Sequence, residues 1–184
     1  MTNKKYYQYI DLPNWQQVSA DILTWITNNT DYTTNKAIRG YVTPDKNRIF
    51  AELPQIQTMF DSINVKVYNM AFIFRNNHIY TEPHYDGVKC SARINLPILN
   101  CENTHTIFYE LKDGAVKQNI YDIRGNRQLN VKFSDCYKVD QVELNKPLVL
   151  CINELHGIFV PAENALPRIS VTFYVDPDPI SFIL

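Results

Sequence analysis

The chain has 184 residues and a formal net charge of −1, with twelve Tyr, nine Phe, ten Pro and only five Gly. This length suits one domain with a sizeable apolar core, and the near-neutral charge argues against a nucleic-acid or anionic-lipid partner, because no broad basic field would attract a polyanion. The frequent aromatic residues and prolines favour strands and fixed turns over a helical bundle.

No part of the sequence indicates a membrane or secreted protein. No apolar run reaches the roughly 20 residues that a membrane-spanning helix needs, and the N-terminal stretch MTNKKYYQYIDLPNW lacks the apolar segment of a secretory signal. The cysteines are scattered and form no CxxC pair, at Cys90, Cys101, Cys136 and Cys151. Isolated cysteines in a chain of this size are typical of a reducing compartment, so we expect a cytoplasmic protein with free thiols.

Helical periodicity appears in the first third of the chain. Residues 13–30, PNWQQVSADILTWITNNT, space their apolar side chains three and four apart, with Pro13 near the start. This pattern predicts an amphipathic helix. A second, shorter helix is predicted within residues 51–64, AELPQIQTMFDSIN, whose apolar side chains also share one side.

From residue 65 onward the apolar pattern has a period of two. Residues 91–99, SARINLPIL, alternate strictly, so that Arg93 and Asn95 point to one side while Ile94 and Leu96 point to the other. Residues 76–86 are expected to be extended, and further strands are predicted at 65–76, 105–111, 137–144, 147–152, 156–160 and 168–175. Turns are predicted at Asp113-Gly114 and Gly125-Asn126.

The order of helices first and many short strands afterwards predicts a fold class and a domain plan. It indicates a mainly β, α+β chain, an antiparallel sandwich or jelly roll buttressed by N-terminal helices. We expect one domain over residues 1–184, with a helical buttress in 1–64, the β core in 65–175 and a tail in 176–184. The tail ends in PISFIL, which is too apolar to stay in solvent and should pack on its own barrel or on a neighbouring chain.

The stretch TEPHYDGVKCSARINLPILN, residues 81–100, carries the first candidate site. In a strand, His84 and Asp86 project to the same side, so an imidazole and a carboxylate would be oriented together for a metal ion. The alternative is a simple turn, because Pro83 precedes the pair and Gly87 follows it.

His156, in CINELHGIFV, is the best candidate for a third ligand. Two histidines and one carboxylate on one side of an ion leave the opposite positions open, which suits a non-haem Fe(II) oxygenase. The same ligand types also suit Mn²⁺, Co²⁺ and Zn²⁺. The alternative for His156 is a half-buried histidine without a metal.

A second candidate site follows in RISVTFY, where Arg168 and Ser170 share one face of a strand. A planar guanidinium can bind a carboxylate through two parallel hydrogen bonds, and the hydroxyl can add a third. A dicarboxylate that chelates the metal through its keto-acid end would place its far carboxylate near this pair. The alternative for Arg168 is a surface arginine.

Together these residues form the pattern PHYD…LHGIFVPAENALPRIS, which resembles the HxD…H…RxS signature of the Fe(II)- and 2-oxoglutarate-dependent oxygenases. The resemblance covers roughly residues 65–175. It implies a double-stranded β-helix of the cupin type, with Fe(II) held by His84, Asp86 and His156. It also implies that Arg168 and Ser170 hold the C5 carboxylate of 2-oxoglutarate.

The segment ARINLPI adds a second resemblance, to the aspartyl/asparaginyl β-hydroxylase branch of these enzymes. In that branch an arginine and a histidine two residues apart face the cosubstrate, which implies a cosubstrate-binding role for Arg93 and Asn95. The branch often lacks the aspartate ligand, whereas this chain has Asp86. The alternative for Arg93 and Asn95 is the solvent face of a sheet.

These patterns lead to one main functional hypothesis and two alternatives. The main one is a dioxygenase that uses Fe(II), 2-oxoglutarate and O₂ to hydroxylate a small molecule or a protein side chain. A non-catalytic jelly-roll module, for binding or for a phage particle, is the first alternative. The second is a cupin-type metalloenzyme without 2-oxoglutarate, which would have to recruit His78 or His105 as a ligand.

Overall fold

The computed structural model of the protein describes residues 5–29, 40–86, 91–121 and 127–183. The helices are α1 (Trp15–Asn29), α2 (Lys46–Glu52) and α3 (Gln55–Asp61), and short 3₁₀ turns occur at η1 (Phe133–Asp135) and η2 (Pro179–Phe182). The strands are β1 (Tyr7–Tyr9), β2 (Gly40–Val42), β3 (Lys66–Arg75), β4 (Ile79–Tyr80), β5 (His84–Asp86), β6 (Ala92–Leu99), β7 (His105–Leu111), β8 (Gln118–Tyr121), β9 (Arg127–Asn130), β10 (Cys136–Glu143), β11 (Leu148–Cys151), β12 (His156–Val160) and β13 (Arg168–Asp176).

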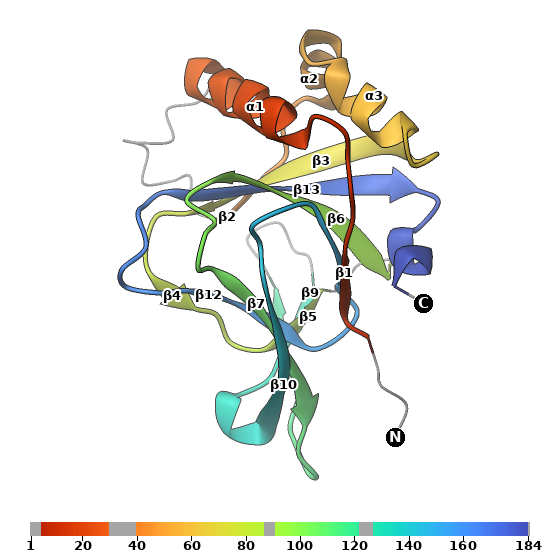
Figure 1. Ribbon diagram of the computed structural model, residues 1–184. Coiled ribbons are helices and arrows are strands. Elements are labelled where there is room, and N and C mark those ends of the chain that lie inside the picture. The colour runs from red at the N-terminus through yellow and green to blue at the C-terminus, as the bar shows by residue number, and fades with distance from the viewer. Residues whose placement is uncertain (1–4, 30–39, 87–90, 122–126, 184) are drawn as a thin grey trace.

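The strands form two antiparallel sheets, and the helices cover the outer face of one of them (Figure 1). The helix-covered sheet has the order β1-β11-β6-β13-β3-β2, and the second sheet has the order β10-β7-β12-β5-β9-β8, with β4 also paired to β12. Among the eight central strands from β3 to β13, the chain changes sheet at every step except the one from β7 to β10. The four central strands β11-β6-β13-β3 and their counterparts β10-β7-β12-β5 therefore form a jelly roll, that is, a double-stranded β-helix. The predicted fold class is confirmed.

The strands predicted from alternation agree with the structure to within a residue at most ends. The structure adds four strands that the sequence pattern did not predict, β1, β2, β8 and β9. The first two have only three residues each, too few to show a period. The turn at Asp113-Gly114 is present, with Gly114 at a φ of +77°. Gly125-Asn126, Gly87 and Cys90 lie outside the described residues.

The predicted first helix is confirmed as α1, which packs on β6 through one apolar side. Val18, Ile22 and Ile26 are buried on that side. Ser19 is buried with them, and its hydroxyl donates a hydrogen bond to the carbonyl oxygen of Pro97 at 2.9 Å. The helix thereby satisfies a carbonyl of β6 as well as covering its apolar side chains.

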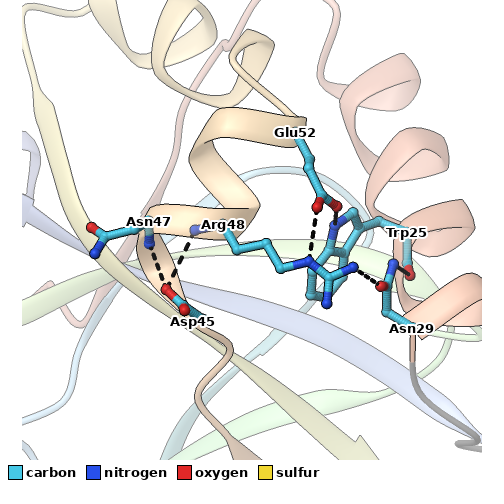
Figure 2. Close-up of polar contacts among 6 residues, drawn as sticks. All are labelled: Trp25, Asn29, Asp45, Asn47, Arg48 and Glu52. Atoms are coloured by element: carbon cyan, nitrogen blue, oxygen red, sulfur yellow. Dashed lines mark hydrogen bonds and ion pairs between the residues drawn. The ribbon is translucent and has the colours of Figure 1, made fainter.

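The predicted second helix consists of two short helices, because α2 starts earlier and α3 begins again after Pro54. Asp45 caps α2: its Oδ1 atom accepts hydrogen bonds from the backbone N–H groups of Asn47 at 2.9 Å and Arg48 at 3.3 Å (Figure 2). An aspartate at this position satisfies N–H groups that have no partner within the helix. Proline is tolerated at the start of a helix but not in its interior, so α3 begins at Gln55.

Figure 2 also shows how α2 is joined to α1 on the surface. The Glu52 carboxylate accepts hydrogen bonds from Arg48 Nε at 2.8 Å and from Trp25 Nε1 at 2.6 Å. Arg48 also donates to the side chain of Asn29. These groups are exposed, so solvent screens their interaction. They orient α2 against α1, while burial of apolar side chains supplies the stability.

The main apolar core lies between the helices and the sheet beneath them. Its largest fully buried side chains include Phe60 of α3, Phe72 and Phe74 of β3, and Phe173 of β13. Phe60 and Phe173 pack edge to face with ring centroids 4.8 Å apart. One side of each central strand is therefore occupied by core packing, which leaves the other side to face the interior of the barrel.

We expect Phe173→Ala to lower the free energy of unfolding by about 3–5 kcal/mol, because it removes a fully buried ring and leaves a cavity. Urea denaturation measures this, and the melting temperature should fall by roughly 10 °C. Val116→Ala is the control, since Val116 is exposed. A loss of under about 1 kcal/mol for Phe173→Ala would contradict the packing described above.

The C-terminal tail packs on the barrel of its own chain. The turn η2 contacts β6 and β11, and Ile183 is buried in the main core. Asp178 begins this turn, and its carboxylate accepts hydrogen bonds from the backbone N–H groups of Ser91 at 2.6 Å and Ile180 at 3.0 Å. Within the described ranges, no helix combines the length and apolarity needed to cross a bilayer.

Candidate metal centre and anion pocket

The structure brings His84, Asp86 and His156 together on the second sheet. His84 and Asp86 are the ends of β5, and His156 begins β12 directly opposite His84 in the strand register. One potential ligand atom from each residue lies within 4.8 Å of the others. The two imidazole rings have centroids 4.7 Å apart, and His84 Nε2 is 3.8 Å from Asp86 Oδ1. His84–Asp86 is therefore a paired strand, whereas the bend that Asp86-Gly87 could begin lies partly outside the described residues.

Backbone hydrogen bonds determine which nitrogen of each histidine can bind a metal. His84 Nδ1 lies 2.8 Å from the carbonyl oxygen of Glu82, and His156 Nδ1 lies 2.8 Å from that of Glu154. A carbonyl oxygen only accepts hydrogen bonds, so both Nδ1 atoms carry the proton and donate. Each Nε2 atom therefore keeps a lone pair for a metal, an orientation typical of metal-bound histidines.

The surroundings of His84 keep its imidazole neutral at neutral pH. Burial, and next the nearby His156, lower the pKa of His84 to about 4, although Asp86 and the hydrogen bond to Glu82 act in the opposite direction. Neutral imidazole is the form that binds metal ions. Within the described part of the chain, the His, Cys, Asp or Glu side chains that lie close enough together to surround an ion are His84, Asp86 and His156. Two imidazoles and one carboxylate fit a divalent transition metal such as Fe(II).

The residue after His156 leaves no space for a side chain. A Cβ atom on Gly157 would lie 2.8 Å from the carbonyl oxygen of Thr81 and 3.1 Å from its hydroxyl oxygen. The Thr81 N–H donates to the carbonyl of Ile158 at 2.9 Å, and the Thr81 hydroxyl accepts from the Ile158 N–H at 2.6 Å. This close approach holds β12, and His156 with it, against the segment that leads into β5.

We expect Gly157→Ala to lower the free energy of unfolding by about 1–3 kcal/mol, because the backbone of Thr81 must move to admit the methyl group. The same shift should weaken Mn²⁺ binding, since it displaces His156. Urea denaturation and isothermal titration with Mn²⁺ measure the two effects. Unchanged stability together with unchanged Mn²⁺ affinity would contradict the close approach.

Arg168 and Ser170 lie together, buried on the inner face of the helix-covered sheet. Arg168 Nη1 donates to the Ser170 hydroxyl at 2.9 Å, and Arg168 Nε donates to the hydroxyl of Thr104 at 3.2 Å. Thr104 is fully buried and donates its own proton to the carbonyl of Cys101 at 2.6 Å. The surface interpretation of Arg168 is wrong, because only 3 % of the residue is exposed. Two hydroxyls thus orient the guanidinium inside the barrel.

Arg93 and Asn95 are buried as well, so the solvent-face alternative is wrong for both. They are 4 % and 6 % exposed, and they share the inner face of β6. Asn95 lies opposite Thr172 of β13, and the Arg93 guanidinium carbon lies 4.4 Å from the ring centroid of Tyr174. Tyr174 is near the far end of β13 from Arg168. Arg93 therefore approaches the barrel interior from the end opposite to Arg168.

The histidines that a cupin-type metal site would recruit do not join the cluster. His78 Nε2 lies 3.0 Å from the carbonyl oxygen of Asn164, and the residue is exposed. His105 pairs with Phe159, whereas His156 pairs with Phe108, so alternation places His105 on the outer face of the second sheet. Among the described residues, neither is part of a possible metal-binding group.

Three residues near these sites escaped the sequence analysis. Arg75 ends β3 directly opposite Arg168, and Thr104 orients Arg168. Asn130 of β9 pairs with His84, and its side-chain oxygen is buried with no hydrogen-bond partner. Of these three residues, only Arg75 could have been found from the sequence, because alternation along the strand places its side chain on the opposite face from Phe72 and Phe74.

No protein-family model and no curated protein sequence matches this chain. Among solved structures, the epimerase SnoN in complex with Fe³⁺, alpha ketoglutarate and nogalamycin RO is similar over 94 % of this chain and 78 % of its own, with a TM-score of 0.52 and 13 % identity. AviO1 from Streptomyces viridochromogenes Tue57 covers 95 % of this chain and 91 % of its own, with a TM-score of 0.49 and 12 % identity. The similarity to SnoN is one of fold, and it agrees with the double-stranded β-helix described above.

Proposed function

We propose that this chain is an Fe(II)- and 2-oxoglutarate-dependent dioxygenase that hydroxylates a C–H bond of a small molecule or a protein side chain. The observation that carries this proposal is the convergence of His84, Asp86 and His156 inside a double-stranded β-helix. A buried arginine on the facing sheet, Arg168, supports it, because an inward guanidinium requires an anionic partner.

In this proposal the three clustered residues hold the metal. His84 and His156 offer their Nε2 lone pairs, and Asp86 offers a carboxylate oxygen that offsets part of the cation's charge. Because both Nδ1 protons are engaged by backbone carbonyls, the rings keep the orientation that binding needs. Three protein ligands leave coordination positions for the cosubstrate and O₂.

Residues of the facing sheet hold the cosubstrate. Arg168, oriented by Ser170 and Thr104, binds the C5 carboxylate of 2-oxoglutarate. Arg93 and Asn95 approach the cosubstrate from the other end of the barrel. When bound, Fe(II) and 2-oxoglutarate supply the chemistry that activates O₂, with release of CO₂ and succinate as one oxygen atom is transferred to the substrate. Burial of these side chains excludes water and strengthens their charge interactions.

The test is an anaerobic titration with Fe(II) followed by 2-oxoglutarate. We expect one Fe(II) per chain and a visible charge-transfer band that appears only when both are present, and then succinate formation once O₂ and ascorbate are admitted. No metal binding would favour the non-catalytic jelly-roll module. Metal binding with neither the band nor succinate would favour the cupin-type enzyme without 2-oxoglutarate.

We also propose a reducing, cytoplasmic location for the protein. Among the described residues, Cys101 and Cys136 are buried free thiols. Burial raises the pKa of Cys136 above its usual value, which keeps that thiol protonated and unreactive. A protein with Fe(II) as its cofactor also benefits from a reducing compartment.

A further inference from the structure

Two arginines lie side by side on the inner face of the helix-covered sheet. Arg75 is the last residue of β3 and Arg168 is the first residue of β13, and the strand register places them directly opposite each other. Directly opposed residues of paired strands project to the same face of a sheet. Arg75 therefore shares the face that carries Arg168 and Ser170, while its neighbour Phe74 points into the core beneath the helices.

No acidic side chain among the described residues neutralises this pair of charges. Within the ranges that the structure describes, no Asp or Glu forms an ion pair with either arginine. Arg168 donates to the neutral hydroxyls of Thr104 and Ser170, and Arg75 Nη1 donates to the carbonyl of Phe74 at 3.1 Å. Arg75 Nε is buried and has no hydrogen-bond partner. Like charges directly opposite one another are destabilising, and a buried unpaired donor adds to that cost.

The electrostatic interaction between the two arginines agrees with this placement. Burial, and next the charge of Arg168, lower the pKa of Arg75 to about 10, so Arg75 remains a cation at neutral pH. A cation held beside another cation inside the barrel requires an anionic partner.

We propose that Arg75 and Arg168 together form a two-arginine subsite that binds the distal carboxylate of the 2-oxo acid cosubstrate, an inference that rests on the proposed function. A carboxylate has two oxygen atoms, and each guanidinium can donate two parallel hydrogen bonds to such a group. The free Nε donor of Arg75 supplies a hydrogen bond that Arg168 cannot, since Arg168 Nε is bound to Thr104. The two positive charges also select against 2-oxo acids that end in a methyl group.

The test compares wild type with Arg75→Gln, which keeps a polar side chain and removes the charge. The Mn²⁺-loaded protein is titrated calorimetrically with N-oxalylglycine, which has the distal carboxylate, and with 2-oxopentanoate, which lacks it. We expect Arg75→Gln to weaken N-oxalylglycine binding by about 10-fold or more, as loss of a charge-assisted hydrogen bond implies. Binding of 2-oxopentanoate should change by less than about threefold.

Controls separate a binding role of Arg75 from a structural one. Arg48→Gln removes an exposed cation far from the pocket and should leave both affinities unchanged. Arg75→Lys keeps the charge and should bind N-oxalylglycine better than Arg75→Gln does. Without ligand, Arg75→Gln should melt no lower than wild type, because it relieves repulsion with Arg168. An arginine that only supported the fold would give a lower melting temperature and equal losses for both ligands.

The remaining outcomes each give a definite answer. If wild type binds N-oxalylglycine and Arg75→Gln binds it equally well, the two-arginine subsite is wrong while the proposed function stands. If Arg75→Gln weakens both ligands equally or unfolds the protein, Arg75 supports the fold and the subsite is also wrong. If Mn²⁺-loaded wild type does not bind N-oxalylglycine, the proposed function is wrong and the two-arginine subsite is wrong as well.

Discussion

Asp86→Ala is expected to reduce Fe(II)-dependent formation of succinate from 2-oxoglutarate by at least about 100-fold. Changes that only touch residues supporting a metal ligand already cost about 10–100-fold in affinity or activity, so loss of the carboxylate ligand itself should exceed that range. The physical reason is charge. Without Asp86, two neutral imidazoles hold the dication, and no anion in the cluster of His84 and His156 offsets it.

The measurement is succinate release in the presence of Fe(II), ascorbate and O₂, together with Mn²⁺ affinity by calorimetry. Asp113→Ala is the matched control, because Asp113 is exposed in a turn away from the cluster. Its activity and metal affinity should equal those of wild type. Equal turnover by wild type and Asp86→Ala would remove the basis of the proposed function, whatever the fold.

Arg168→Ala is expected to raise the apparent KM for 2-oxoglutarate by about 10–100-fold, while kcat at saturating cosubstrate changes far less. Hydrogen bonds to charged groups contribute about 1.5–3 kcal/mol, and each 1.4 kcal/mol corresponds to about tenfold in affinity. The guanidinium is buried and its side chain is already oriented by Thr104 and Ser170, so little further entropy is lost on binding. Its loss should therefore act on cosubstrate binding rather than on the later chemistry.

Initial rates at varied 2-oxoglutarate give the two constants. Arg168→Lys should fall between alanine and wild type, since an ammonium keeps the charge but cannot form the bidentate geometry. Arg48→Ala is the control for loss of a surface cation. An apparent KM that stays within about twofold of wild type for Arg168→Ala would rule out this residue as the cosubstrate anchor.

Alternation along single strands was sufficient to predict most of the barrel. The segments that became β6 and β13 alternate between apolar core residues and more polar residues on the other face, and this pattern depends only on the geometry of an extended chain. The same local geometry predicted that His84 would lie beside Asp86, and Arg168 beside Ser170. Such pairs are two residues apart on one strand, so the strand itself determines their common side.

Elements without a local sequence pattern were not predicted, because they depend on contacts with other parts of the chain. Helix α2 depends on the capping contacts of Asp45 and on its surface contacts with α1, and it is too short to show a helical period. Strands β8 and β9 form a hairpin that extends the sheet beyond β5, and their pairing depends on an edge supplied by another part of the chain. Arg93 and Asn95 showed the right alternation, but alternation does not tell which side of a sheet is covered.

By itself, the sequence determined the strand segments, the first helix and two pairs of polar residues, one on β5 and one on β13. These features follow from neighbours a few residues apart. Only the tertiary structure decided that His156 meets His84, that Arg93 and Asn95 are buried, and that Arg75 stands opposite Arg168. The physical reason is register. Which residues face one another across two strands depends on hydrogen bonds between distant segments, and a shift of one residue would turn every one of these side chains to the other face.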